Sequence, residues 1–147
     1  MNIGIASDHR GVTQKKKLIK YLEAKGHNIY NYGTDSEESV DYPDYAFLIG
    51  NKINEGEIEL GILICGTGVG MCIASNKVRG IRCAKVDNTK EAKLSRLHNN
   101  ANVISLSSYM GLTKMKDILD VFIKTKFSNE ERHLLRLNKV DNYNNEY

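Results

Sequence analysis

The sequence predicts an α/β fold: a three-layer, Rossmann-like α/β/α arrangement around a five-stranded parallel sheet. Two observations support this prediction. Short apolar runs alternate with longer amphipathic segments along the chain, a pattern typical of parallel strands joined by helices. In addition, the apolar run at 60–64 ends in Cys65 and a glycine-rich loop, as expected of a buried strand in such a sheet.

Each element follows from a local pattern. Strands are expected at 3–6, 27–30, 60–64, 81–86 and 102–106. Helices are expected at 12–25, 69–76 and 89–97. Another helix should begin at Pro43, with an inner face of Ala46, Ile49, Gly50 and Ile53. A long amphipathic helix is indicated by Leu112, Met115, Ile118, Leu119, Phe122 and Ile123. Gly26 suits the position after the first helix. Ser128 and Glu131 have the spacing of a capping box, which predicts one last helix.

The chain reads as one domain. It has 147 residues, of which 41% are hydrophobic and 27% charged, the range of a globular protein with a single core. Internal repeats and linkers are absent from the sequence. The domain is therefore taken as 1–147, with a short disordered tail expected at about 141–147, where asparagines gather.

Composition also excludes several classes. The net charge of +3 is weak and Lys15-Lys16-Lys17, interpreted as a solvated helix face, is the only lysine cluster, so no nucleic-acid partner is expected. No apolar stretch approaches the roughly 18 residues of a membrane helix, and the start is too quickly polar for a signal peptide. Three cysteines without CxxC spacing argue against a disulfide frame or a metal site, and for a reducing, cytoplasmic location.

Cys65 and the loop 66–70 are the most informative site. A free cysteine is commonly a small buried hydrophobe, but this one ends a strand beside a loop rich in N–H donors, which would stabilise a thiolate. The loop lacks Walker residues, because Met71 and Cys72 stand where a P-loop has Lys and Ser/Thr. Asp87 lies near the offset of a dinucleotide site, so spacing leaves that alternative open. An anion hole beside a catalytic thiol is favoured.

Other polar residues are expected near the same cleft. Asp8-His9 follows the first strand, and a carboxylate with an imidazole can move protons between sugar oxygens. His98-Asn99 ends the helix before the fifth strand and is expected to face the same cleft as Asp8 and Cys65. Arg132 and Arg136 are four residues apart, so both project from one helix face and suit a phosphate, although a solvated face is an equal alternative.

An ordered set of motifs carries a resemblance to a known family. It comprises Asp8-His9-x-Gly11, Asp41-Tyr42-Pro43, Cys65-Gly66-Thr67-Gly68-x-Gly70-Met71, Asn76-Lys77, Gly80-x-Arg82, His98-Asn99, Ala101-Asn102-Val103 and Arg132-His133-x-x-Arg136. Over about residues 2–140 the chain resembles the type B ribose-5-phosphate isomerases, a family that also includes allose-6-phosphate and galactose-6-phosphate isomerases.

The resemblance implies an aldose–ketose isomerase of sugar phosphates that uses no metal or organic cofactor. It assigns ring opening to His98 and Asp8 with help from Thr67, and transfer of the C2 proton to C1 to Cys65. The implied substrate-binding residues are Gly66, Gly68, Val69 and Gly70 for the enediolate, His9, Arg132 and Arg136 for the phosphate, and Tyr42 and Asn99 along the site. It also implies a homodimer, sometimes a tetramer, with both arginines supplied by the partner subunit.

The chain departs from the family pattern at three places. Arg10 stands where most members have a small residue, Ser107-Ser108-Tyr109 where many have a phosphate-binding arginine, and Asn100 where aspartate is usual. We hypothesise that Arg10 supplies the charge missing at Tyr109. Some members have a glutamate base at the position of Met71, so this chain resembles the cysteine-base kind.

Ribose 5-phosphate is the leading substrate, and a six-carbon sugar phosphate is the alternative within the family. Two alternatives come from other classes. A non-catalytic, flavodoxin-like nucleotide-binding domain would not need Cys65, His98 or the arginine pair. A redox-sensing thiol protein would need a resolving cysteine, and Cys72 is poorly placed to resolve Cys65.

Overall fold

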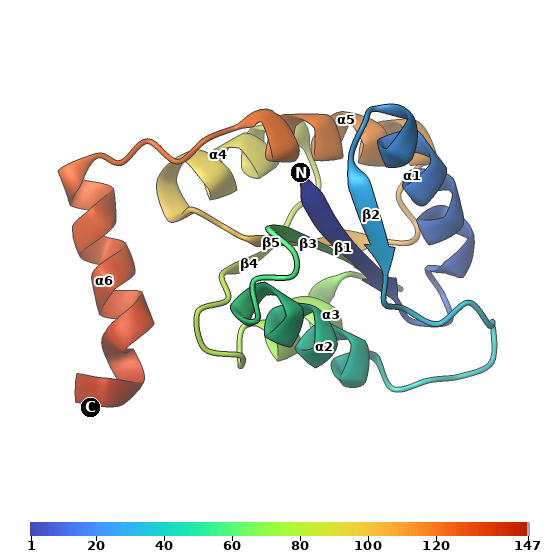
Figure 1. Cartoon of the computed structure of the whole chain (residues 1–147), viewed down its shortest axis with the longest axis horizontal. Helices are drawn as coiled ribbons and strands as arrows, with labels where there is room; N and C mark the ends of the chain where they lie inside the picture. The colour runs from blue at the N-terminus through green and yellow to red at the C-terminus, as the bar shows by residue number, and fades with distance from the viewer. Residues whose placement is uncertain (147) are drawn as a thin grey trace.

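The computed structural model describes residues 1–146, and side chains up to residue 143. Its sheet has five parallel strands in the order β2-β1-β3-β5-β4. The strands are β1 (Asn2–Ser7), β2 (Asn28–Asn31), β3 (Leu60–Cys65), β4 (Cys83–Lys85) and β5 (Val103–Ser107). The helices are α1 (Val12–Ala24), α2 (Tyr42–Asn54), α3 (Val69–Ser75), α4 (Thr89–Asn99), α5 (Leu112–Lys124) and α6 (Glu131–Glu146) (Figure 1).

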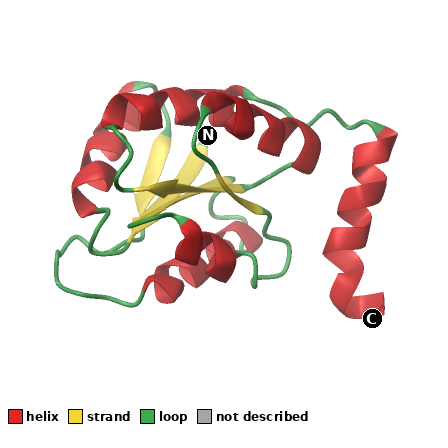
Figure 2. Ribbon diagram, turned by 180° about the vertical axis from the view of Figure 1, so that it is seen from behind, coloured by secondary structure: helices red, strands yellow, loops and turns green. Residues whose placement is uncertain are grey.

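Two helical layers enclose the sheet. Helices α1, α4 and α5 cover one face, and α2 and α3 cover the other (Figures 1 and 2). Alternate residues of β3 serve the two layers, since Ile62 and Ile64 join the core under α1, α4 and α5 while Leu63 and Cys65 join the core under α2 and α3. This confirms the predicted three-layer α/β/α fold, and each expected strand and helix is present with its ends shifted by a few residues.

The last helix is where the structure differs most from expectation. It begins at Glu131, and the Ser128 hydroxyl accepts the Glu130 N–H at 3.3 Å instead of capping residue 131. Asn129 has a φ of +56°, which interrupts a helical path from Ser128, so the capping-box prediction is wrong. Helix α6 then continues to Glu146, where a disordered tail was expected. Tyr147 lies outside the described residues.

Lys15 is fully buried, which corrects its interpretation as part of a solvated face. It shares the inward side of α1 with Leu18 and Leu22. Its ammonium reaches the edge of the core, where it lies 2.7 Å from both Asn31 Oδ1 and Asp35 Oδ1. The hydrogen bond from Lys15 lowers the pKa of Asp35. Lys15 therefore anchors the start of the long loop between β2 and α2.

The strand order creates a crevice at the carboxyl edge of the sheet. From β1 the chain moves to β2 on one side, whereas β3 and β5 lie on the other. The loops that follow β1 and β3 therefore leave the sheet side by side, the position where open α/β sheets bind ligands. A backbone hydrogen bond of 3.1 Å from the Asp8 N–H to the Ile64 carbonyl joins the two strand ends.

Candidate functional site

The buried thiol of Cys65 lies at the end of β3. Its residue is 5% exposed, and its Sγ accepts the Gly68 N–H at 3.2 Å. The structure therefore places the Cys65 sulfur at the crevice with a backbone N–H directed at it.

The loop that follows is shaped by β5. The hydroxyls of Ser105 and Ser107 donate to the carbonyls of Gly68 and Gly66 at 2.6 and 2.7 Å. Because a trans peptide points its N–H opposite to its carbonyl, the N–H groups of the next residues, Thr67 and Val69, face away from β5. The Val69 N–H donates to Thr67 Oγ1 at 3.2 Å. The loop thus turns backbone donors toward the crevice.

Two glycines of this loop are required by space or by backbone. Gly68 has a φ of +79°, and a Cβ there would lie 3.0 Å from the Leu106 carbonyl carbon. At Gly70 a Cβ would lie 2.8 Å from the Tyr42 ring. Tyr42 therefore packs directly over the start of α3.

The loop after β1 brings Asp8 and His9 to the same edge. Asp8 is 5% exposed, and its Oδ1 accepts the Arg10 N–H at 2.9 Å. His9 Nδ1 accepts the Val40 N–H at 3.3 Å, so the proton of a neutral His9 ring lies on Nε2. A histidine held in this way offers an N–H donor to an anion.

Arg10 and Tyr109 lie together above Gly66. Arg10 Nη1 donates to the Tyr109 hydroxyl at 3.3 Å, and a Cβ on Gly66 would lie 3.1 Å from Arg10 Cδ. Both side chains are exposed and Arg10 forms no ion pair within residues 1–143. Two of the three departures from the family pattern, at residues 10 and 109, are thus neighbours beside the glycine loop.

His98-Asn99 lies at the other edge of the sheet, so the expectation of a shared cleft within one chain is wrong. Helix α4 ends immediately before β5 begins, and the start of β5 pairs with Gly61, whereas Cys65 pairs with Ser107 at its end. Four steps of extended strand separate these pairs, about 13 Å. A helix that links parallel strands runs back to the amino edge, so its last turn cannot reach the carboxyl edge.

His98 contacts α6 instead. Its ring stacks on that of His133 with centroids 4.5 Å apart. Burial and the proximity of His98 lower the pKa of His133. Arg132 and Arg136 project from the same helix and are exposed, with Arg132 Nε 2.8 Å from Glu130 Oε2. Thus the expected ring-opening histidine and both expected phosphate arginines gather at the amino edge.

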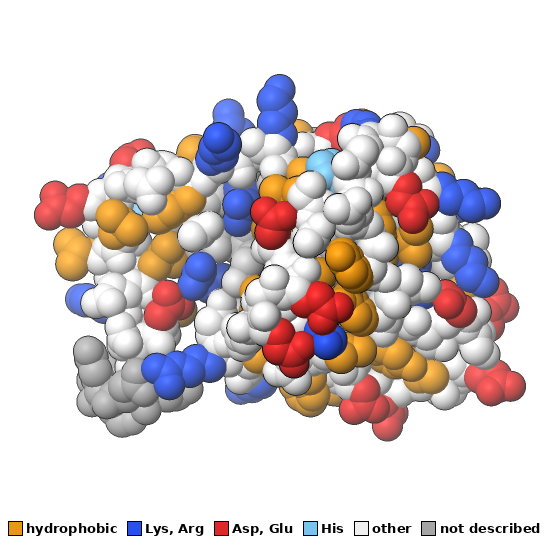
Figure 3. Space-filling view, in the orientation of Figure 1, with side chains coloured by type: hydrophobic (Ala, Val, Ile, Leu, Met, Phe, Trp, Pro, Cys, Tyr) orange, Lys and Arg blue, Asp and Glu red, His pale blue; other side chains and the backbone are white. Residues whose placement is uncertain are grey.

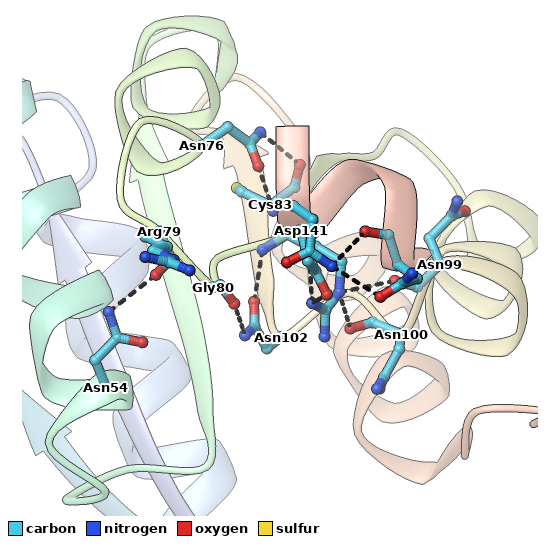
Figure 4. Close-up of polar contacts among 12 residues, drawn as sticks. Asn54, Asn76, Arg79, Gly80, Cys83, Asn99, Asn100, Asn102 and Asp141 are labelled. Atoms are coloured by element: carbon cyan, nitrogen blue, oxygen red, sulfur yellow. Dashed lines mark hydrogen bonds and ion pairs between the residues drawn. The ribbon is translucent and has the colours of Figure 1, made fainter. Parts of the chain in front are cut away.

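Arg82 holds this second cluster together and was singled out in the sequence only as part of a motif. Its Nε donates to the carbonyls of Asn99 and Asn100 at 3.1 and 3.2 Å, and its Nη1 lies 3.0 Å from both carboxylate oxygens of Asp141 (Figure 4). A cavity of about 460 Å³ lies here, between residues 76–84 and α6. It does not include Cys65, so it is separate from the thiol crevice.

Among the residues that the structure describes, no group of three or more His, Cys, Asp or Glu side chains could hold a metal ion. No helix in this part of the chain is both long and apolar enough to cross a membrane.

Comparison with known proteins identifies the family of this chain. The family model described as Ribose/Galactose Isomerase matches residues 3–140. The chain belongs to this family. The match confirms the resemblance seen in the ordered motifs, and with it the assignment as a sugar-phosphate isomerase.

Relatives in the ribose/galactose isomerase family match over nearly the whole chain. A probable ribose-5-phosphate isomerase B of Mycoplasma genitalium is 44% identical over 99% of this chain and 97% of its own length. The structure of ribose-5-phosphate isomerase B from Clostridium thermocellum matches 100% of this chain and 99% of that chain, with a TM-score of 0.96 and 40% identity. The structure of the Mycoplasma genitalium isomerase with bound ribulose-5-phosphate matches 99% of this chain and 97% of that chain, with a TM-score of 0.93 and 44% identity.

Proposed function

We propose that this chain interconverts ribose 5-phosphate and ribulose 5-phosphate. The observation that carries the proposal is Cys65, a buried thiol at a ligand-binding strand end whose sulfur accepts the Gly68 N–H. Support for the substrate comes from the similar protein of Mycoplasma genitalium, whose structure contains ribulose-5-phosphate. A six-carbon sugar phosphate is the second candidate, because the matching family covers galactose isomerases as well.

In the proposed mechanism, Cys65 acts as the base. Its thiolate removes the C2 proton of the open-chain sugar, electrons move to the carbonyl oxygen to give a cis-enediolate, and the proton returns to C1. A carbon beside a carbonyl is a weak acid, so the oxyanion needs donors as much as the carbon needs a base. The turned N–H groups of the loop 66–70 supply them, and each such donor typically lowers a barrier by about 2.7–4 kcal/mol.

Ring opening and phosphate binding use the remaining residues. We assign proton transfer to the ring oxygens to Asp8 and His98, assisted by Thr67. The phosphate is held by His9, through its Nε2 proton, and by Arg132 and Arg136, with Arg10 as an additional cation. Tyr42 and Asn99 line the site. No metal or organic cofactor takes part in this mechanism.

This mechanism requires a homodimer, or a tetramer built from such dimers, that shares its active sites. Within one chain His98 and the arginine pair lie at the edge opposite Cys65, so a second copy must supply them. Exposed apolar side chains support such an interface. They follow α2 and α3 at Tyr42, Phe47, Val69 and Ile73, and α6 at Leu134, Leu135, Val140 and Tyr143, where Figure 3 shows hydrophobic side chains along the outer helix. We propose that the enzyme works in the cytoplasm, with a small molecule as its only ligand.

The test is a comparison of native and Cys65→Ala chains on three substrates. The native chain should isomerise ribose 5-phosphate with a higher kcat/KM than allose 6-phosphate or galactose 6-phosphate. Cys65→Ala should lower kcat by about 10³-fold and leave KM little changed, since the thiol acts on the C2 proton and not on the phosphate.

Three outcomes would contradict the proposal. A native chain that is inactive on ribose 5-phosphate would exclude the pentose assignment, and a higher kcat/KM on a six-carbon substrate would replace it. A fully active Cys65→Ala chain would exclude the thiol as base. Circular dichroism of the variant shows that a loss of activity is not a loss of fold.

A further inference from the structure

Cys72 and Cys83 form a second thiol site, separate from Cys65. Cys72 lies on α3 and Cys83 begins the edge strand β4. The Cys72 thiol donates to the Cys83 carbonyl oxygen at 3.4 Å. Both residues are free cysteines and only half-buried, whereas Cys65 is enclosed and uses its sulfur toward Gly68.

Asn76 fixes the two cysteines relative to each other. β4 is the edge strand, and the Asn76 side chain pairs with it as a neighbouring strand would. Its Oδ1 accepts the Cys83 N–H at 2.8 Å, and its Nδ2 donates to the Cys83 carbonyl at 2.9 Å (Figure 4). The same Nδ2 lies 3.0 Å from the Cys72 carbonyl and 3.6 Å from its Sγ. One amide therefore clamps the end of α3 to the start of β4.

We propose that Cys72 and Cys83 are a redox modification site, which a hydroperoxide converts into a reversible intrachain disulfide. The Cys72 thiolate attacks the peroxide, the O–O bond breaks, and the sulfur is oxidised to a sulfenic acid while an alcohol or water leaves. The Cys83 thiol then attacks this sulfur, forming the S–S bond and releasing water. The two thiols lose two electrons in total, and the peroxide gains them.

Electrostatics assigns the two roles. The hydrogen bond from the Cys83 thiol is the largest of the influences that lower the pKa of Cys72 to about 7, and the Lys85 N–H, Asn76 and the Lys85 charge add to it against burial. The hydrogen bond to Cys72 and burial raise the pKa of Cys83. Cys72 is thus the thiolate that reacts first, and Cys83 keeps its proton until it resolves the sulfenic acid. Cys72 is partly exposed and Cys83 lines the cavity beside α6, so neither thiol is sealed from small oxidants.

The experiment uses the full chain with Cys65→Ser, so that the active-site thiol takes no part. The reduced protein is treated with hydrogen peroxide and its intact mass is measured. We expect a loss of two hydrogen atoms, restored by dithiothreitol. After tryptic digestion the fragment 53–77 should be joined to the fragment 83–85, since each then contains a single cysteine.

Matched variants separate the steps. In Cys83→Ser a 1,3-diketone should trap a sulfenic acid at Cys72, and in Cys72→Ser trapping at residue 83 should be on the order of tenfold slower. Asn76→Ala should slow disulfide closure by about tenfold, because it releases the clamp.

Other results would overturn the proposal. They are an unchanged mass after peroxide treatment, addition of two oxygens at Cys72 with Cys83 left free, a disulfide between chains, or equal trapping rates at the two cysteines. None of these readouts depends on isomerase activity, so they judge the thiol pair alone.

Discussion

The two edges of the sheet differ in how complete they are. At the carboxyl edge, neighbouring strands fix the functional groups: β5 serines hold the glycine loop, and the Asp8 N–H joins Ile64. At the amino edge, α6 lies apart from the two helical layers (Figure 2). It contacts the body through buried His133 and Leu137 and through Asp141. Its arginines and four of its larger apolar side chains remain exposed.

This difference indicates that the two edges carry different parts of an active site. The carboxyl edge has the Cys65 thiol, which we propose as the base, with backbone donors beside it, and Arg10 and His9 near the same loop. The amino edge has Arg132, Arg136 and His98, and Cys83 there belongs to the separate thiol pair. Ile73 on α3 is 59% exposed and Val140 on α6 is 62% exposed, so each edge also has an apolar surface that a second copy could cover. Each chain thus resembles one half of an active site at its carboxyl edge and the complementary half of a second active site at its amino edge.

The strongest way to test this comparison is to mix two inactive chains. Cys65→Ala lacks the base, and a chain with Arg132→Ala and Arg136→Ala lacks the expected phosphate cations. If sites are shared, half of the randomly mixed dimers have one intact site, so activity should return to about a quarter of the native value. Ribose 5-phosphate turnover is measured after the two chains are co-refolded.

The control for the mixing experiment is a single chain that carries both sets of changes, mixed with the native chain. If sites are shared, each site of such a heterodimer lacks either Cys65 or the arginines, so only the native homodimers are active and the mixture keeps about a quarter of the native activity. If each site lies within one chain, every heterodimer keeps one intact site and the mixture keeps about half. Two inactive chains that stay inactive after mixing, with a control that keeps about half of the native activity, would show that the division between edges is wrong.

Much of the fold could be predicted because its signals are local. The inward face of α5 is fully buried at Met115, Ile118, Leu119 and Phe122, as its spacing predicted. The start of α2 at Tyr42 and Pro43 and the left-handed Gly26 after α1 follow equally from residue type. The Cys65 loop was found in the same way, since an apolar strand, a thiol and glycines are adjacent in sequence.

The errors came from geometry that no local pattern contains. Placing His98 with Cys65 ignored the direction of α4, which strand connectivity alone would have revealed. The run Lys15-Lys16-Lys17 predicts a charged face, although Lys15 is three residues from Leu18 on the same helix face. Its burial depends on Asn31 and Asp35, which are brought to it by tertiary structure.

A smaller effect would sharpen the description of the carboxyl edge. Arg10→Ala should raise KM for ribose 5-phosphate by about tenfold, the loss of one charged hydrogen bond, with kcat nearly unchanged. Arg10→Lys should recover part of this loss, and Tyr109→Phe, which removes only the 3.3 Å contact to Arg10, should change KM little. An unchanged KM in Arg10→Ala would show that the phosphate does not lie near this residue.

The smallest effect concerns the docking of α6 at the amino edge. His133 is buried, and its Nε2 makes no hydrogen bond within the described part of the chain; Glu130 Oε2 is 4.0 Å away. The pKa of His133 is lowered below the ordinary 6.5, mainly by burial and then by the nearby His98 and Arg132. The unfolded chain therefore binds more protons below about pH 6.5, and the native fold should lose stability as pH falls through that range. Thermal unfolding from about pH 7.5 to about pH 5.5 measures this loss.

His133→Phe keeps a ring against His98 but cannot be protonated. It should flatten the pH dependence of Tm by a few degrees, whereas the control His27→Phe should leave the pH dependence as it is in the native chain. If His133→Phe follows the native profile, His133 does not titrate between the folded and unfolded states. The stack on His98 would then act only as a packing contact, and the docking of α6 would not weaken in acid through this residue.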